Sequence, residues 1–97
     1  MKPRRLLLTD RAVSDIEGRA VFLSQERGSK FAMLWAKSLV DWLEKIASAG
    51  AQLGTAHPHE GSFRTFGYKK QATILAEFKT SELRIIRVYF AVQDWSR

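Results

Sequence analysis

The sequence contains no cysteine, only two prolines among its 97 residues, and no long apolar run. Without cysteine the chain can form neither a disulfide nor a thiolate zinc site, which argues against a disulfide-rich extracellular scaffold. The three leucines that follow Met1-Lys2-Pro3-Arg4-Arg5 are too few for a signal-peptide core. No later apolar run approaches the roughly 20 residues of a membrane span. We therefore expect a soluble, cytoplasmic protein with no membrane segment.

Acidic side chains are also scarce, since 10 Asp and Glu stand against 16 Lys and Arg, a formal net charge of +6. Such an excess favours an acidic partner, either nucleic acid or an acidic protein, although a generic soluble surface is the alternative. With 45% hydrophobic residues, the chain fits a single globular domain, residues 1–97. A chain of this length buries about two thirds of its unfolded surface, so it can build one core.

A strand is strongly indicated near the C-terminus, where residues 83–90 are β-branched, aliphatic or aromatic apart from two arginines. This composition predicts a central strand that is apolar, and therefore covered, on both faces. Arg84 and Arg87 are three residues apart, so strict alternation places them on opposite faces. An arginine among such neighbours is expected either to be ion-paired or to belong to a binding site.

Two helices are predicted in the first half of the chain. Leu6-Leu7-Leu8 indicates a short strand at or near a sheet edge, and Thr9 is a candidate N-cap for a helix that stops at Gly28. Ser29 is a candidate cap for a second helix, which lasts until Gly50. About two residues join the helices, so we expect an antiparallel hairpin. The apolar positions at helical spacing are Val13, Ile16, Ala20 and Leu23, then Phe31, Trp35, Leu39, Trp42 or Leu43, and Ile46.

Residues 51–61 have the composition of a loop, with two glycines, Pro58 and two histidines. His57 and His59 have no Cys, Asp or third His close by that would complete a metal site. We therefore predict a solvated loop and no metal.

Three strands complete the predicted fold. Residues 63–66 indicate a short strand, Gly67 a turn, and residues 71–78 a second strand that a turn at residues 79–82 joins to the last one. If all four turn residues form the loop, Glu77 faces Arg84, whereas a three-residue loop would change every partner. In the four-residue register Phe78 faces Leu83, and one face carries Ile74, Ala76, Phe78, Leu83, Ile85, Arg87 and Tyr89.

Three short motifs add to this order of elements. They are Phe63-Arg64-Thr65-Phe66-Gly67-Tyr68, Leu83-Arg84-Ile85-Ile86-Arg87-Val88-Tyr89, and Gln93-Asp94-Trp95. Together they resemble the arginine-bearing strand, the hydrophobic last strand and the ParE-type tail of the RelE/ParE superfamily, the toxins of bacterial toxin–antitoxin pairs. The resemblance covers nearly the whole chain. It implies an α+β fold, β-α-α-β-β-β, with an antiparallel helix hairpin packed on a small, mostly antiparallel sheet, and no cofactor.

The activity that the resemblance implies depends on the branch. RelE-like members cut messenger RNA on the ribosome, whereas ParE-like members poison DNA gyrase without known nuclease chemistry. Cleavage through the 2′-hydroxyl needs a base, a group that stabilises the phosphorane, and an acid. Where many relatives carry histidine this chain has Phe90, and Tyr89 is the nearby candidate. We therefore favour a ParE-type toxin that inhibits gyrase by protein contact, is neutralised by a cognate antitoxin, and has no assigned catalytic residue.

The resemblance also supplies candidate site residues. Target or antitoxin binding is expected at Arg64, Lys69, Lys70, Arg87 and Trp95. In the alternative, a ribosome-dependent mRNA endoribonuclease, catalysis would use Arg64, Lys70, Arg87 and Tyr89. The phosphate-binding cations would then be Arg64, Lys69, Lys70 and Arg87. A plain basic binding module is the third reading. Trp35 and Trp42, seven apart on one helix face, are expected in the core instead.

Overall fold

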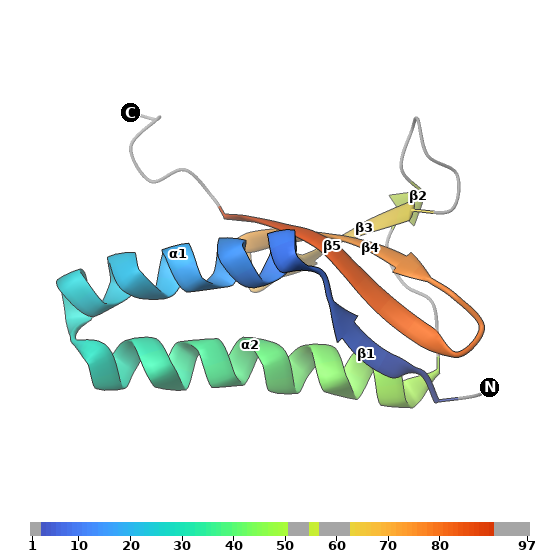
Figure 1. Ribbon diagram of the computed structural model, residues 1–97, viewed down its shortest axis with the longest axis horizontal. Helices are drawn as coiled ribbons and strands as arrows, with labels where there is room; N and C mark the ends of the chain where they lie inside the picture. The colour runs from blue at the N-terminus through green and yellow to red at the C-terminus, as the bar shows by residue number, and fades with distance from the viewer. Residues whose placement is uncertain (1–2, 51–54, 57–62, 91–97) are drawn as a thin grey trace.

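A computed structural model describes residues 3–50, 55–56 and 63–90 (Figure 1). The elements are β1 (Arg5–Leu8), α1 (Asp10–Arg27), α2 (Ser29–Ala49), β2 (Thr55–Ala56), β3 (Phe63–Tyr68), β4 (Ala72–Phe78) and β5 (Glu82–Phe90). The predicted order is confirmed, except that the two-residue strand β2 lies in a stretch expected to be loop. Neither described helix is long and apolar enough to cross a membrane.

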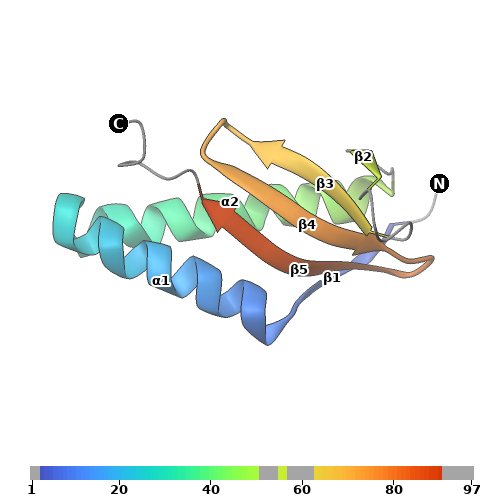
Figure 2. The ribbon, with the colours of Figure 1, turned by 90° about the horizontal axis from the view of Figure 1, so that it is seen from above.

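The strands form one sheet in the order β1-β5-β4-β3-β2. The first strand pairs with β5 in parallel, while the other pairs are antiparallel, which confirms the mostly antiparallel sheet. As predicted, β1 lies at an edge and β5 in the interior. Figure 2 looks onto the sheet with β3, β4 and β5 in front of α2. Within the described ranges no helix covers this near face, so the cover expected on both faces of β5 is found on one.

The helices form the expected antiparallel hairpin (Figure 1), and Gly28 alone joins them. The Thr9 hydroxyl caps α1 by accepting the Ala12 N–H at 3.2 Å, and it lies 2.9 Å from the Ile86 carbonyl oxygen, to which it donates. Ser29, the predicted cap of α2, is instead its first residue. Gly28 takes the cap position with a φ of 95°, which glycine adopts without steric cost and which lets the chain reverse within one residue.

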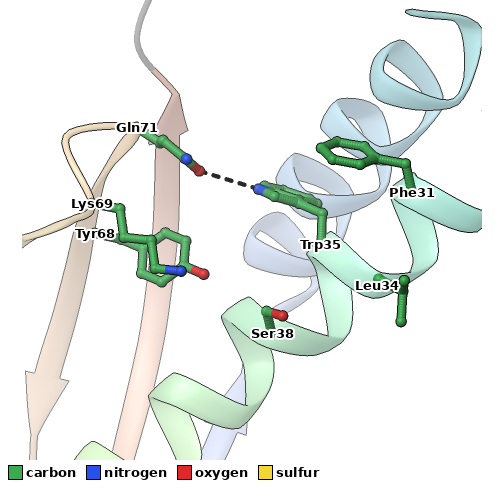
Figure 3. Close-up of a pocket in the computed structure, with 7 residues that line it drawn as sticks. All are labelled: Phe31, Leu34, Trp35, Ser38, Tyr68, Lys69 and Gln71. Atoms are coloured by element: carbon green, nitrogen blue, oxygen red, sulfur yellow. Dashed lines mark hydrogen bonds between the residues drawn. The ribbon is translucent and has the colours of Figure 1, made fainter. Parts of the chain in front are cut away.

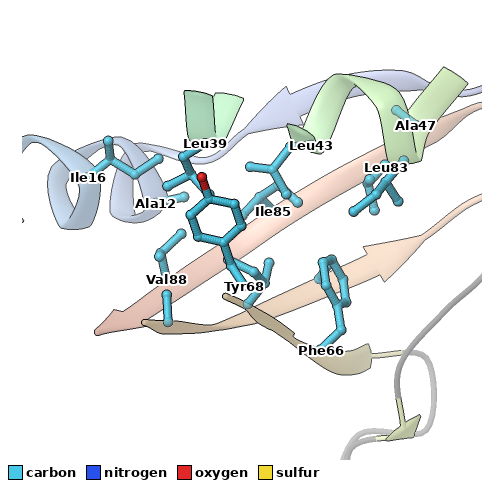
Figure 4. Close-up of a cluster of buried hydrophobic side chains, with 14 residues drawn as sticks. Ala12, Ile16, Leu39, Leu43, Ala47, Phe66, Tyr68, Leu83, Ile85 and Val88 are labelled. Carbon is cyan, nitrogen blue, oxygen red and sulfur yellow. The ribbon is translucent and has the colours of Figure 1, made fainter. Parts of the chain in front are cut away.

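The core lies between the helix hairpin and one face of the sheet (Figure 4). Trp35 and Trp42, predicted in the core, are half-buried at its margin, where the Trp42 ring lies 4.8 Å from the ring of Tyr68. The buried cluster comprises Ala12, Ile16, Leu39, Leu43, Ile46, Ala47, Phe66, Tyr68, Ala72, Ile74, Ala76, Leu83, Ile85 and Val88.

The predicted register of the last hairpin is confirmed at its turn, where Phe78 pairs with Leu83 and Glu77 with Arg84. The apolar pair explains this register, because a one-residue slip would expose the apolar set. The ion pair of Arg84 is with Glu82, at 3.1 Å, so the predicted match of charge with Glu77 is not what fixes the register.

Farther along, a β-bulge interrupts the pairing of β4 and β5. Ala76 pairs with Ile85 but Leu75 pairs with Arg87, which leaves Ile86 as an extra residue in β5. The expectation that Arg87 and Tyr89 share the face of Ile85 is therefore wrong. The bulge shifts the alternation by one residue and brings Val88 into the core instead. It also explains why β5 is apolar at both odd and even positions although one face is buried.

The turn between β3 and β4 lies two residues later than predicted. Gly67 is inside β3, and the chain reverses at Lys69 and Lys70, which have φ angles of 49° and 59°. The Gln71 N–H donates to the Tyr68 carbonyl at 2.7 Å and closes the turn. Positive φ at both central residues is the requirement of a type I′ turn, for which Asn-Gly is the preferred sequence. Lys69 and Lys70 do not match that preference, so the sequence gave no signal for a turn at this position.

Candidate functional site

Arg87 is paired with an acid. Its Nε and Nη2 donate to the two carboxylate oxygens of Asp15 at 2.8 and 3.0 Å, and the same carboxylate accepts the Val88 backbone N–H at 2.9 Å. The pairing of β1 with β5 ends at Ile85, so beyond it Asp15 of α1 provides the acceptor that a strand neighbour would supply. The sequence alone did not indicate Asp15 as the partner of Arg87. The one hint is that Asp15 lies beside Ile16, at the flank of the apolar stripe of the first helix.

The Asp15–Arg87 pair is ionised and held in place. Burial raises the pKa of Asp15, but the hydrogen bonds from Arg87 and the Val88 N–H, together with the charges of Arg87 and Arg11, outweigh burial and lower this pKa below its ordinary value. The hydrogen bond to Asp15 in turn raises the pKa of Arg87. The guanidinium carbon also lies 5.1 Å from the centre of the Tyr89 ring. The arginine thus has an acid and an aromatic ring as neighbours.

Arg84 and Arg87 lie on the same face of the sheet, which corrects the expectation that they point to opposite sides. Arg84 pairs with Glu77 and Arg87 with Leu75, and those two partners are alternate residues of the regular strand β4. The bulge in β5 supplies the extra residue that makes this possible. We call the surface of Leu75, Glu77, Arg84, Arg87 and Tyr89 the open face, because it lies opposite the helices.

The four cations predicted to bind phosphate do not gather in one place. Arg64 pairs with the buried Ala76, so the register puts it on the helix side of the sheet, away from Arg87. Lys69 and Lys70 are at the β3–β4 turn, about 16 Å along the strand from Arg64. Among the predicted catalytic residues, the structure brings Arg87 and Tyr89 together.

Three other predicted positions, His57, His59 and Trp95, lie outside the described residues, so their roles stay predictions. Within residues 3–50, 55–56 and 63–90, no group of three or more His, Cys, Asp or Glu could hold a metal ion.

A groove that the sequence did not reveal separates α2 from the β3–β4 turn (Figure 3). Its central cavity, of about 260 Å³, has Phe31, Leu34, Trp35 and Ser38 of α2 on one side and Tyr68, Lys69 and Gln71 on the other. The Trp35 Nε1–H donates across it to Gln71 Oε1 at 3.3 Å. Cavities of about 220 and 300 Å³ adjoin it and share several of these residues. We call the three together the hairpin groove.

One patch on the outer surface of the helices is exposed and apolar. Met33 and Val21 are 72% and 58% exposed, and both line a shallow hollow of about 270 Å³ whose wall is almost entirely apolar. Exposed apolar side chains that adjoin in this way are suited to contact with another protein. We call it the outer hairpin face, and it comprises Ala20, Val21, Ser24, Ser29, Ala32, Met33 and Ala36.

No protein-family model matches the sequence. A search of curated proteins finds no match either. Among solved structures, a chain described as "Chromosomal ParDE TA system from P. aeruginosa" is similar, with a TM-score of 0.76 and 16% sequence identity. The likeness covers 92% of this chain and 97% of that chain. The protein therefore has the fold of a chain from a ParDE toxin–antitoxin system, as its resemblance to the RelE/ParE superfamily predicts.

Proposed function

We propose that the protein is the toxin of a type II toxin–antitoxin system, that residues 1–97 act as a single toxin domain, and that it works in the cytoplasm. The observation that carries this proposal is the likeness of fold, which extends over 92% of this chain and 97% of the ParDE system chain. A net charge of +6 and the exposed outer hairpin face support capture by an acidic, amphipathic segment of a cognate antitoxin.

The proposed action is inhibition of DNA gyrase by protein contact. Two observations support it over cleavage of messenger RNA. Arg87 is occupied by Asp15, while Arg64 lies on the other side of the sheet, so these cations are not arranged around one phosphate. Phe90, at the position where many relatives carry histidine, packs 5.5 Å from the Trp35 ring on the helix side. A phenylalanine at this position supplies neither the acid nor the base that a histidine would.

One observation favours the alternative function, cleavage of messenger RNA. Tyr89 is 47% exposed and its ring lies 5.1 Å from the Arg87 guanidinium, so a phenol and a cation adjoin on the open face. Within the described residues, this pair is the candidate for a nuclease site.

Purified protein tested in two parallel reactions separates these activities. We expect it to block supercoiling by gyrase and to leave ribosome-bound messenger RNA intact. Codon-linked cleavage of the RNA, lost on Tyr89→Phe, would move the assignment to the nuclease branch. Arg87 is a predicted contact residue, so Arg87→Ala should lose gyrase inhibition, and thermal unfolding should show that the fold survives the loss of its ion pair with Asp15. The matched control is Arg84→Ala on the same face, which should keep it.

Antitoxin capture is tested by co-purification with the product of the neighbouring reading frame. Met33→Asp places a negative charge on the outer hairpin face at a largely exposed position, so the fold should tolerate it while an acidic antitoxin segment is repelled. Leu7→Asp, on the sheet edge, is the control and should leave capture unchanged. Equal capture by both variants would exclude the outer hairpin face.

A further inference from the structure

One cavity of the hairpin groove, of about 220 Å³, lies between α1, α2 and the end of β5. We call it the α1-side cavity. It shares Trp35 and Gln71 with the central cavity, and the hydrogen bond of 3.3 Å between these two side chains stands between the two hollows. The α1-side cavity is therefore a site of its own.

Two arginines of α1 line this cavity without an acidic partner. Within the described part of the chain, neither Arg19 nor Arg27 forms an ion pair, and no Asp or Glu is among the residues that line the cavity. The guanidinium carbon of Arg19 lies 5.6 Å from the centre of the Phe90 ring, and that of Arg27 lies 4.6 Å from the centre of the Phe31 ring. Such contacts restrict long side chains in advance, so less conformational entropy is lost when a carboxylate binds.

Aromatic surface is the second property of the cavity. Phe31 is 38% exposed, and the half-buried rings of Trp35 and Phe90 pack against each other with their centres 5.5 Å apart. All three side chains line the cavity. A further flat ring placed there would be stabilised by burial and by offset or edge-to-face contacts. The cavity therefore suits a ligand that carries an aromatic ring next to a negative charge.

The chain carries such a pair shortly after β5. Residues 91–97 lie outside the described residues, and their sequence places Asp94 directly before Trp95. Successive side chains of an extended segment point to opposite sides. Asp94 can therefore face the arginines of α1 while Trp95 faces the rings of α2.

This segment follows directly on a residue of the cavity wall. Phe90 is the last residue of β5 and lines the cavity, and Figure 2 shows β5 ending beside the helix hairpin. Trp95 is five residues farther along, and five extended residues span about 17 Å, which is long enough for the chain to turn back onto the cavity. A ligand on so short a linker has an effective concentration of the order of millimolar, which favours it over a separate protein of the same chemistry.

We propose that the α1-side cavity binds residues 91–97 of the same chain, with the Asp94 carboxylate at Arg27 and the Trp95 ring against Phe31. Trp95 then contacts its own domain, in place of the predicted contact with a target or an antitoxin. The inference is independent of the proposed toxin function, because it concerns contacts within one chain.

Fluorine NMR of the full chain labelled with 5-fluorotryptophan tests the inference, and Trp95→Phe identifies the Trp95 resonance. We expect this resonance to differ from that of a labelled peptide of residues 91–97, and Arg27→Gln should move it towards the peptide value. Lys30→Gln is the matched control, because it removes an exposed cation at the same end of the hairpin that does not line the cavity. Both variants should melt at the same temperature as the wild type. The inference is overturned if the wild-type resonance coincides with that of the peptide, or if both variants move it equally.

Disulfide trapping gives a second readout, because the chain has no cysteine of its own. Ser96→Cys is combined with Leu23→Cys in the α1-side cavity or, as the control, with Ser24→Cys on the outer hairpin face. In a glutathione buffer the first pair should form an intramolecular disulfide at least about tenfold more readily than the second. Equal closure of the two pairs would show that the segment is not directed to the cavity. Disulfide-linked dimers in place of monomers would seat the segment on a second copy, and either result overturns the inference.

Discussion

Replacing Asp15 by Ala removes the carboxylate that joins α1 to the unpaired edge of β5. The Asp15 side chain is 15% exposed, and its oxygens accept three hydrogen bonds, two from Arg87 and one from the Val88 N–H. After the substitution the Arg87 guanidinium can turn towards solvent, because its side chain is 27% exposed. The Val88 N–H cannot turn, since it belongs to the backbone of a residue that is 2% exposed.

The unsatisfied Val88 N–H determines the expected loss. A buried donor without an acceptor costs about 1 to 3 kcal/mol. For a domain of this size each 1 kcal/mol lowers the melting temperature by about 4 to 8 °C.

Urea unfolding of wild type and Asp15→Ala, followed by circular dichroism, measures this loss. Asp41→Ala is the matched control, because it removes an exposed carboxylate whose ion pair with Lys37 is worth about 0.5 kcal/mol or less. The reasoning is refuted if Asp15→Ala unfolds within about 0.5 kcal/mol of the wild type.

Further predictions concern the same junction and the core. The advantage of wild type over Asp15→Asn should be complete above the ordinary pKa of 3.8 and disappear as the pH falls through the lower folded-state pKa, which unfolding at a series of pH values would show. Thr9→Ala removes the cap of α1 and the bond to β5, and should lower the free energy of unfolding in urea by about 1 to 2 kcal/mol. An unchanged free energy of unfolding would show that the cap does not contribute to stability. Leu39→Ala, at a fully buried position, should lower the free energy of unfolding by about 2 to 5 kcal/mol. A loss of less than about 1 kcal/mol would contradict the packing described.

The fold was predictable where its determinants are local. The Thr9 cap and the apolar spacing of the helices are read from neighbouring residues, and the pairing of Glu77 with Arg84 follows from the short turn between them. The bulge at Ile86 was not predictable in the same way. Apolar residues occupy successive positions on both sides of Arg87, so either alternation suits the sequence, and contacts with the helices decide which residues are buried.

The candidate site was less predictable because its contacts are distant in sequence. Asp15 and Arg87 are 72 residues apart, and no pattern within either segment indicates the other. The hairpin groove likewise needs Trp35 of α2 and Gln71 of the β3–β4 turn to be brought together. Lys69 was predicted as a binding residue, but its place in that groove depends on a turn that the sequence put at Gly67.

Expression of the chain alone in bacterial cells, with and without its neighbouring antitoxin, tests the central claim most directly. Cells are scored for filamentation and the DNA damage response on one side and for loss of messenger RNA on the other. A gyrase-directed toxin predicts filamentation and DNA damage signalling with messenger RNA intact, and recovery when the antitoxin is co-expressed. Rapid loss of messenger RNA without DNA damage would contradict gyrase as the target, and unimpaired growth without any antitoxin would contradict the toxin function itself.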